Sequence, residues 1–417
     1  MRQSALITKT RKNAPHGEEA VNAELLIRGG FIHKEMAGVY TLLPLGWKVV
    51  QNIEQIVREE MDAAGGQEMK LTALQAKETW EQSGRWSDEE LDVWFKTQLA
   101  AGGEVGLGAT HEEPLTRLLT EHIASYRDLP KAVYQIQTKF RNELRAKSGV
   151  LRGREFRMKD LYSFSRSAQE HEAFYEQMKD VYTRVFARLG IGAETYLTFA
   201  SGGSFAPYSH EFQMVCEAGE DTIYIDTEKN LAINDEVYSD DVCAELGVSK
   251  EKLEKKRAIE VGNIFTLGTR FSEAFGLQYK DEEGASSLVH MGSYGIGTTR
   301  LMGAMVEALG SAEAMVWPKE VAPYVAHVIA LGEDASVMEE ATAIYEAMQK
   351  RGVSVLFDDR EGKSPGEKFA DADLLGAPLR IVVGSRGLAE GVVEVTNRLT
   401  GEVEQVPKDK AGAYEMA

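Results

Sequence analysis

The sequence KFRNELRAKSGVLRGREFRMK at residues 139–159 is unusually rich in basic side chains. The whole chain of 417 residues has a formal net charge of −19, so this local excess of positive charge stands out. The basic residues are Lys139, Arg141, Arg145, Lys147, Arg152, Arg154, Arg157 and Lys159. Such a cluster predicts either a site for an anionic ligand or a hairpin whose charges are solvated.

Strand patterns flank this cluster on both sides. Residues 132–140 (AVYQIQTKF) and 155–164 (EFRMKDLYSF) have aromatic and β-branched side chains near alternating positions. The polar stretch between them contains Gly149 and Gly153. We therefore predict a long antiparallel hairpin with arginines at its tip. Because Arg presents a planar fork of donors to phosphate oxygens, this hairpin is suited to surround a polyphosphate.

Three short motifs, in this order along the chain, resemble those of the class II aminoacyl-tRNA synthetases. Residues 108–113 (GATHEE) resemble the amino-acid-binding loop of the prolyl enzymes. Residues 140–143 (FRNE), Arg152 and residues 154–156 (REF) resemble motif 2, and residues 295–300 (GIGTTR) resemble motif 3. Three ordered motifs are far more specific than one, so the chain is similar to the bacterial-type prolyl-tRNA synthetases.

The resemblance covers almost the entire chain, from residues 1–4 (MRQS) to residues 358–360 (DDR). It implies an α+β catalytic domain with an antiparallel sheet, the class II synthetase fold, and a C-terminal α/β anticodon-binding domain. Regular alternation of strand and helix patterns beyond residues 317–323 supports that boundary. We expect the catalytic domain in two parts, residues 1–229 and residues 259–320. A short linker or small subdomain at residues 230–258 separates them, and the anticodon-binding domain is expected at residues 323–417.

Motif 1 of this class is represented by a helix and a strand pattern. Residues 46–64 predict an amphipathic helix that ends at Gly65-Gly66, and residues 68–74 predict a strand. In relatives motif 1 builds the dimer interface, so the resemblance implies a homodimer. Thr72 stands where the family has a proline. The helix pattern by itself fits ordinary core packing equally well.

The ATP-binding residues are assigned by the resemblance. Arg141 would contact the α-phosphate and the amino-acid carboxylate, Glu143 would face the adenine side, and Arg152 would take the γ-phosphate. Phe156 and Arg300 would cover the two faces of adenine. Taken alone, Phe156 could equally be a core aromatic residue.

The resemblance also places three further residues beside ATP. Gly297 would let the backbone approach the ligand closely, and Glu260 and Asn263 match positions that help to hold ATP and its Mg²⁺. Glu260 is the candidate metal ligand. Arg141 and Arg300 are the residues that we expect to be catalytic.

Proline is a small secondary ammonium with a carboxylate, so its pocket needs an acceptor, a cation and an apolar wall. Thr110 and Glu112 suit the ammonium, although Thr110 with Glu113 also fits a capping box for a helix at residues 110–126. The residues assigned to the proline pocket are Thr110, Glu112, Arg141, Met158, Asp160, Tyr162 and Phe212, with His210 as a second-tier candidate.

The anticodon would be read at a strand-to-helix edge of the C-terminal domain. The candidates there are Asp359, Arg360, Glu361 and Lys368. Such edges present ligand-binding loops in α/β sheets, although a solvated loop has the same pattern.

Composition limits the compartment and the cofactors. Apolar runs fall short of the roughly 20 residues that cross a bilayer, and the N-terminus lacks the apolar core of a signal peptide. We therefore expect a cytoplasmic protein without membrane contact. Cys216 and Cys243 lack the paired spacing of a zinc site or a disulfide framework, so ATP and Mg²⁺ are the expected cofactors, with no zinc.

Two partial nucleotide motifs are rejected. Residues 295–297 before a helix pattern are similar to a dinucleotide-binding fingerprint, but Arg300 stands where its third glycine is required. Residues 362–364 (GKS) are similar to the end of a P-loop, but Phe357 stands at the position of its first glycine.

The expected function is therefore ATP-dependent ligation of L-proline to tRNA(Pro), with the prolyl adenylate as intermediate. Alternatives are a class II ligase for threonine or glycine and a synthetase-like regulator that binds tRNA without charging it. Many bacterial relatives carry a large editing domain where this chain has residues 230–258. This segment is too short to bury a core and a second site, so a separate trans-editing protein would have to correct mischarged tRNA.

Overall fold

The computed structural model describes residues 1–14, 20–144, 146, 148–203, 205–311, 313–332 and 334–415. Internal contacts divide the chain into two compact units. Unit 1 comprises Met1–Glu35, Tyr40–Asn52 and Met305–Ala417, and unit 2 comprises Met36–Val39 and Ile53–Ala304. The N-terminal residues thus group with the C-terminal part of the chain, a grouping that the predicted domain boundaries do not include.

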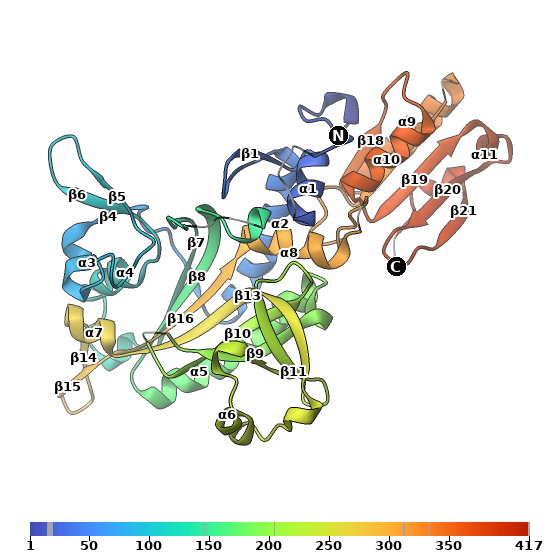
Figure 1. Ribbon diagram of the computed structural model, residues 1–417. Helices are drawn as coiled ribbons and strands as arrows, with labels where there is room; N and C mark the ends of the chain where they lie inside the picture. Colours follow the sequence, from blue (N-terminus) through green and yellow to red (C-terminus); the bar gives the residue numbers. More distant parts are fainter. Residues whose placement is uncertain are drawn as a thin grey trace. The chain divides into compact units, whose positions relative to one another are not determined.

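A large, mostly antiparallel sheet organises unit 2 (Figure 1). Its strand order is β10-β9-β12-β11-β13-β16-β8-β7-β3, and the β9–β12 and β3–β7 pairs are parallel. The strands are β3 (Gln67–Glu68), β7 (Lys131–Phe140), β8 (Glu155–Ser165), β9 (Thr195–Ser201), β10 (Tyr208–Val215), β11 (Asp221–Asp226), β12 (Leu231–Asn234), β13 (Glu254–Gly268) and β16 (His290–Gly297). This sheet confirms the antiparallel α+β fold class.

The predicted hairpin is formed by β7 and β8, which pair in antiparallel register over their whole length. Because successive side chains of a strand point to opposite faces, β8 has two different surfaces. Its odd-numbered residues face the helices: the Lys159 ammonium donates to the Tyr182 hydroxyl of α5 (Ala168–Arg188) at 2.7 Å. Its even-numbered residues, which include Phe156, lie on the other face.

Shorter elements complete unit 2. They are β4 (Leu74–Ala76), α3 (Lys77–Ser83), β5 (Phe95–Gln98), β6 (Glu104–Leu107), α4 (Glu112–Leu119), η2 (Tyr126–Asp128), η3 (Gly149–Leu151), η4 (Gly192–Glu194), η5 (Asp235–Val237), α6 (Asp240–Glu245), η6 (Lys250–Lys252), α7 (Arg270–Phe275), β14 (Gln278–Lys280) and β15 (Ser286–Leu288). The two units share α2 (Pro44–Ala63), α8 (Thr298–Leu309), β1 (Ile32–Met36) and β2 (Val39–Leu42).

Two local predictions near the start of unit 2 were wrong. The helix expected over residues 110–126 is limited to α4, and the predicted capping box is not formed, since the Thr110 hydroxyl donates to the Glu112 carboxylate at 2.7 Å. The strand expected over residues 68–74 ends with β3. The residues that follow β3 are held by side chains of β7 and of the 108–112 loop.

The segment expected to be a linker or small subdomain contributes β12 and the start of β13 to the large sheet. Within residues 230–258, Ile233, Val242 and Cys243 are buried in a small cluster with Phe199 of β9. The segment is therefore a packed subdomain, and it shares its core with the sheet.

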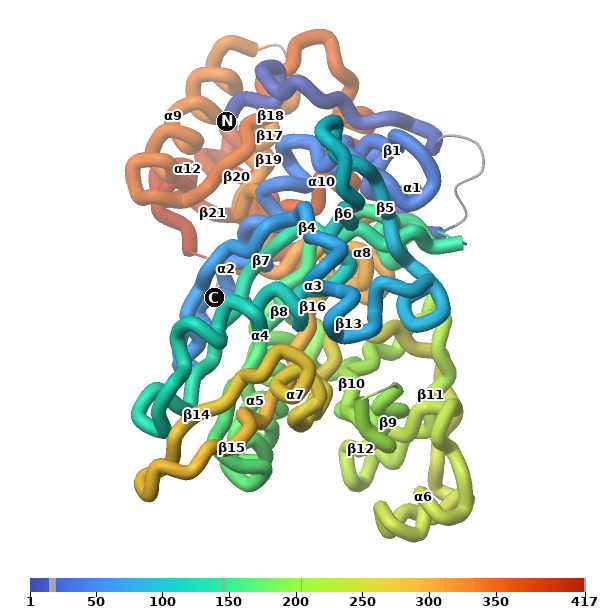
Figure 2. The backbone as a smooth tube through the Cα atoms, turned by 90° about the vertical axis from the view of Figure 1, so that its left-hand side faces the viewer, coloured from blue at the N-terminus to red at the C-terminus, as the bar shows by residue number. Residues whose placement is uncertain are grey.

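Unit 1 contains an α/β sheet with the strand order β18-β17-β19-β20-β21. The first three strands are parallel and the last two are antiparallel, and α9 and α12 pack beside each other (Figure 2). The elements are η1 (Gln3–Ala5), α1 (Val21–Arg28), β17 (Ala326–Leu331), α9 (Ala335–Lys350), β18 (Val355–Asp358), α10 (Pro365–Leu375), β19 (Leu379–Gly384), α11 (Ser385–Ala389), β20 (Val392–Asn397), β21 (Val403–Pro407) and α12 (Lys408–Ala411).

Residues 1–12 are here called the N-terminal arm, and residues 1–4 of this arm run along the β18 edge of this sheet. Arg2 forms a parallel bridge with Phe357. The Ser4 hydroxyl donates to Asp359 at 2.8 Å, and the Ser4 backbone N–H donates to the same carboxylate at 3.0 Å. The arm therefore adds to the sheet as a further edge segment. Among the described residues, the helices are all too short or too polar to cross a membrane.

Candidate active site

One end of the β7–β8 hairpin gathers the side chains predicted to bind ATP. Arg141 directly follows β7, and its guanidinium lies over the Phe156 ring, 5.3 Å from the ring centroid. Arg300, in the first turn of α8, donates from Nε to the Leu151 carbonyl at 2.8 Å and from Nη1 to the Glu260 carboxylate at 3.0 Å. These side chains line a small cavity. Its lining residues are Arg141, Glu143, Val150, Leu151, Arg152, Gly153, Phe156 and Arg300.

The cavity concentrates positive charge. Burial and the nearby Arg300 lower the pKa of Arg141 from its ordinary value. The Arg141 guanidinium nevertheless stays charged, because the ordinary pKa of arginine is above 12. Two cations at one cavity repel each other, so an anionic ligand that binds between them is stabilised.

Arg152 flanks this cavity in an arrangement with two carboxylates. Its Nε donates to Glu143 at 3.1 Å and its Nη1 donates to Glu220 at 3.0 Å. Glu143 and Arg152, which the motif places on opposite sides of the hairpin tip, thus form a direct hydrogen-bonded ion pair. Glu220 was not among the predicted residues.

Glu260, which contacts Arg300, and Glu211 lie on the neighbouring strands β13 and β10. Glu260 accepts from the Asn263 amide at 2.6 Å, and Glu211 accepts from Gln213 at 2.9 Å. Burial and the neighbouring Glu260 raise the pKa of Glu211 to about 8. Glu211 was not among the residues predicted from the sequence, since a single carboxylate in a strand has no distinguishing pattern.

Glu211 and Glu260 are candidate ligands for Mg²⁺. Among the described residues, no group of three or more His, Cys, Asp or Glu side chains is arranged to hold a metal ion. Mg²⁺ that arrives with ATP keeps several waters and needs only one or two protein carboxylates. The repulsion that raises the pKa of Glu211 is relieved by a divalent cation, so Glu211 and Glu260 fit this ion.

Gly297 lies where α8 begins. A Cβ added to Gly297 would lie 3.2 Å from the Cβ of Arg300, which is a tight contact. Glycine here therefore keeps the backbone before α8 close to the arginine that lines the cavity.

The predicted ammonium ligands meet at the start of α4. The Thr110 hydroxyl donates to Glu112, and the Arg85 guanidinium lies 3.3 Å from Glu112 and 2.9 Å from Glu113. Arg85 is buried against the Trp80 ring, 5.3 Å from its centroid. Sequence reasoning missed Arg85 because this residue belongs to no recognised motif, although the three tryptophans of residues 80–94 could have indicated a core.

Asp160 and Tyr162 are buried on the same face of β8 as Phe156. The Tyr162 hydroxyl donates to Asp160 at 3.0 Å, and the Lys139 ammonium forms an ion pair with Asp160 at 2.7 Å. Met158 lies between Phe156 and Asp160 on this face and is half-buried. Met158, Asp160 and Tyr162 thus share one face of β8, and their role in binding proline stays a prediction.

Phe212 does not belong to this face. Its ring packs against Tyr182 and Phe186 of α5, with centroid distances of 5.2 Å in both cases. The side chain therefore points to the helix-covered side of β10, and the expectation that it walls the proline pocket is incorrect. His210 lies on the same side and accepts from, or donates to, the Tyr175 hydroxyl at 3.0 Å.

The cations of the basic cluster fall into two groups that the sequence does not distinguish. Lys139 and Lys159 are fully buried, and Arg157 pairs with Glu54 of α2 at 2.5 Å. The two lysines are therefore internal, and Arg157 is partly buried in an ion pair. Of the described residues of the cluster, Arg141 and Arg152 line the cavity. Arg145 and Lys147 lie outside the described residues.

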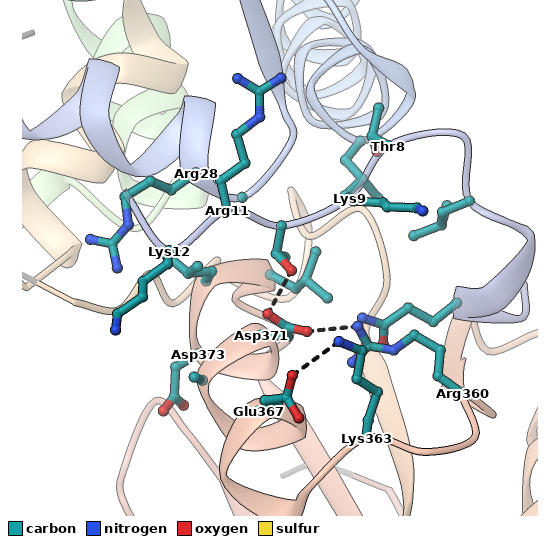
Figure 3. A pocket seen from close by; sticks show the side chains of 18 of the residues that line it. Thr8, Lys9, Arg11, Lys12, Arg28, Arg360, Lys363, Glu367, Asp371 and Asp373 are labelled. Atoms are coloured by element: carbon teal, nitrogen blue, oxygen red, sulfur yellow. Dashed lines mark hydrogen bonds and ion pairs between the residues drawn. The ribbon is translucent and has the colours of Figure 1, made fainter. Parts of the chain in front are cut away.

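Three of the four predicted anticodon-reading residues, Asp359, Arg360 and Glu361, line a cleft in unit 1 of about 1210 Å³ (Figure 3). Glu361 lines this cleft. Arg360 pairs with Asp358 at 2.7 Å and with Asp371 at 2.6 Å. These carboxylates raise the pKa of Arg360 although burial opposes them. Arg360 is thus held rigidly at the rim by two acids.

The other two predicted residues have internal partners. Asp359 binds Ser4 of the N-terminal arm. Lys368 is 3% exposed and donates to the Ala330 carbonyl at 2.8 Å. Direct base contacts by these two side chains would require them to leave these partners, so their role in reading the anticodon stays a prediction.

Comparison with known protein families identifies two domains in this chain. The tRNA synthetase class II core domain (G, H, P, S and T) matches residues 95–309, and an anticodon binding domain matches residues 326–414. Fold and site together therefore define a class II aminoacyl-tRNA synthetase.

Similar proteins narrow the class. The proline–tRNA ligase of Phenylobacterium zucineum (strain HLK1) is 39% identical over 437 residues, which span 99% of this chain and 99% of that protein. The proline–tRNA ligase of Wolbachia pipientis wMel is 36% identical over 430 residues, with 99% and 98% covered. This chain belongs to the proline–tRNA ligase family.

A solved structure has the same fold. A prolyl-tRNA synthetase from Cryptosporidium parvum, in complex with L-proline and AMP, matches with a TM-score of 0.74 at 19% identity, covering 93% of this chain and 72% of that chain.

Proposed function

We propose that this chain ligates L-proline to tRNA(Pro) with ATP, first forming prolyl adenylate and then transferring the prolyl group to the tRNA 3′ end. The observation that carries the proposal is the convergence of Arg141, Phe156 and Arg300 on one cavity in unit 2. Family membership supports proline as the amino acid, because the curated relatives are proline–tRNA ligases along the whole chain.

Adenylate formation requires positioning and charge stabilisation. The proline carboxylate is already ionised, so it attacks the α-phosphorus of ATP without a general base, and pyrophosphate leaves. Arg141 stabilises the negative charge that develops at the α-phosphate. Phe156 and Arg300 hold adenine between an aromatic face and a planar guanidinium. Arg152, Glu143 and Asn263 complete the ATP site.

Mg²⁺ bound with ATP supplies positive charge to the phosphates. Glu260 would hold it, together with Glu211. The neutral form that burial favours for Glu211 would give way to the carboxylate when the cation arrives, because a nearby positive charge favours ionisation.

The proline ammonium would bind at Thr110 and Glu112. Arg85 holds Glu112 at 3.3 Å, which fixes the orientation of its carboxylate. Asp160 adds a second negative charge behind the pocket, and Met158 and Tyr162 provide the wall. The proline carboxylate would meet Arg141.

The remaining proposals concern tRNA and assembly. Residues 323–417 would bind the anticodon, with Glu361 and Arg360 at the cleft of Figure 3. The enzyme would act in the cytoplasm as a homodimer, by resemblance to motif 1 of its class. Correction of alanyl-tRNA would be left to a separate trans-editing protein, since residues 230–258 form only a small cluster with β9.

The decisive test is ATP–pyrophosphate exchange with each amino acid in turn. We expect exchange that depends on proline, with weaker exchange on alanine. Exchange that depends on threonine or glycine instead would identify another class II ligase. Exchange with none of the amino acids, despite tRNA binding, would identify a regulator.

A further inference from the structure

The loop that carries Thr110 and Glu112 rests on the segment that follows β3. The Gly108 backbone N–H donates to the Ala73 carbonyl at 2.8 Å, and the Gln75 amide donates to the Thr110 carbonyl at 3.0 Å. These hydrogen bonds fix the backbone at Gly108 and at Thr110, where the proposed ligands of the proline ammonium lie. The residue between these ligands, His111, is fully buried.

His111 is held by both of its ring nitrogens. Nε2 lies 3.1 Å from the Thr72 carbonyl, and Nδ1 lies 2.8 Å from the Lys139 ammonium. A carbonyl only accepts and an ammonium only donates, so the proton of the neutral ring sits on Nε2. Burial and the Lys139 charge lower the pKa of His111 to about 4, which agrees with a neutral ring at physiological pH.

Lys139 connects this ring to the floor of the proline site. It is fully buried on β7, and its ammonium lies 2.7 Å from Asp160. Asp160 also accepts from Gln135 and Tyr162, each at 3.0 Å. The Tyr162 hydroxyl in turn accepts from the His111 backbone N–H at 3.2 Å. His111 is thus fixed through its ring by Lys139 and through its backbone by Tyr162.

We infer that Lys139 and His111 are positioning residues for proline. They hold the loop so that Thr110 and Glu112 face the ammonium. This inference rests on the proposed function. A buried ion pair can often be replaced as a whole by apolar side chains without loss of stability, whereas removal of one partner leaves the other charge unpaired. Stability alone therefore does not require a lysine–aspartate pair here. What an apolar residue could not do is donate to His111 and fix its tautomer.

The chain offers a matched control in Lys159. It is also fully buried in the hairpin, but on the opposite face of the sheet, where it donates to the Tyr182 hydroxyl at 2.7 Å and to the Tyr294 carbonyl at 2.9 Å. Lys139→Met and Lys159→Met each remove a buried ammonium from the same hairpin. They differ in whether the proline loop loses its support.

The experiment measures KM for proline and KM for ATP by pyrophosphate exchange, and measures proline binding by the thermal shift that proline induces. Lys139→Met should raise KM for proline about 10- to 100-fold, the effect of losing a hydrogen bond to a charged group, and should change KM for ATP less than twofold. His111→Phe, which keeps a ring but removes both nitrogens, should act in the same direction. Lys159→Met should leave the ratio of the two KM values unchanged.

Several results would overturn the inference. One is an unchanged KM for proline in folded Lys139→Met, and another is an equal rise in both KM values in the Lys139 and Lys159 variants. Failure of both Lys139→Met and His111→Phe to fold would also overturn it, since a structural role would then suffice. Wild-type enzyme without proline-dependent exchange would refute the proposed function itself, which is a separate outcome.

Discussion

Replacing Glu113 by glutamine should change how stability depends on pH. Glu113 is fully buried next to Glu112, with Arg85 at 2.9 Å. Burial is the main reason that its pKa is raised from 4.5 to about 7, with Glu112 adding to the rise and Arg85 opposing it. The folded protein therefore holds this proton more tightly than the unfolded chain does. Stability is lost as pH rises from about 4.5, and the loss is complete above about pH 7.

The size of the effect follows from the shift. One pKa unit corresponds to about 1.4 kcal/mol, so ionising Glu113 removes about 3 kcal/mol in total. Roughly 1.4 kcal/mol of this is already lost at pH 5.5. Glu113→Gln keeps an oxygen that can accept from Arg85 and from Ser83, but it does not titrate. The free energy of unfolding of Glu113→Gln minus that of the wild type should therefore increase by about 2 kcal/mol between pH 5.5 and pH 8.

Urea unfolding at a series of pH values measures this difference directly. Trp80 and Trp94 lie in edge-to-face contact beside Arg85, and the Trp94 indole donates to the Arg85 carbonyl at 3.0 Å. Tryptophan fluorescence therefore reports unfolding around the site. Glu78→Gln, at an exposed position of α3, is the control and should show a constant difference. A constant or shrinking difference for Glu113→Gln would mean that Glu113 is ionised in the folded protein, contrary to this reasoning.

Three other predictions test the reaction and its partners. Arg141→Ala should lower proline-dependent pyrophosphate exchange by about a hundredfold or more at an unchanged melting temperature, and near-normal exchange would rule out its role at the α-phosphate. Glu361→Ala should raise KM for tRNA in the charging assay and leave exchange within twofold; equal effects on both would place Glu361 outside the anticodon site. The enzyme should activate alanine, which is smaller than proline and cannot be excluded by size, yet should not deacylate alanyl-tRNA(Pro). Enzyme-dependent release of alanine from that tRNA would reveal an editing site.

The parts of the fold that sequence predicted are those with regular local periodicity. The β7–β8 hairpin alternates apolar and polar residues, and α2 and α5 have apolar residues every three or four positions, so each could be identified without knowledge of its partners. The C-terminal α/β unit was predictable for the same reason. The proposed ATP-binding residues Arg141, Phe156 and Arg300 were located because an ordered set of motifs carries them.

What sequence missed depends on contacts between distant segments. Lys139 and Lys159 look like surface cations, but Asp160 and Tyr182 make their burial possible. Arg85 has no local motif, and its partners Glu112 and Glu113 lie on another element. Phe212 was assigned to the wrong face because an aromatic residue in a strand gives no indication of which side of the sheet it occupies.

The N-terminal arm ties the order of synthesis to the order of assembly. Ser4 and Asp359, which bind each other, are separated by 355 residues along the chain. At about 5–20 residues per second, on the order of 20–70 s pass between the synthesis of the two. Unit 2 ends at Ala304, so all of its residues are made before β17 and β18. A nascent chain that stalls between residues 304 and 326 would carry the large sheet and an arm without its partner strand. The arm is thus among the first segments to be made and among the last to find its place.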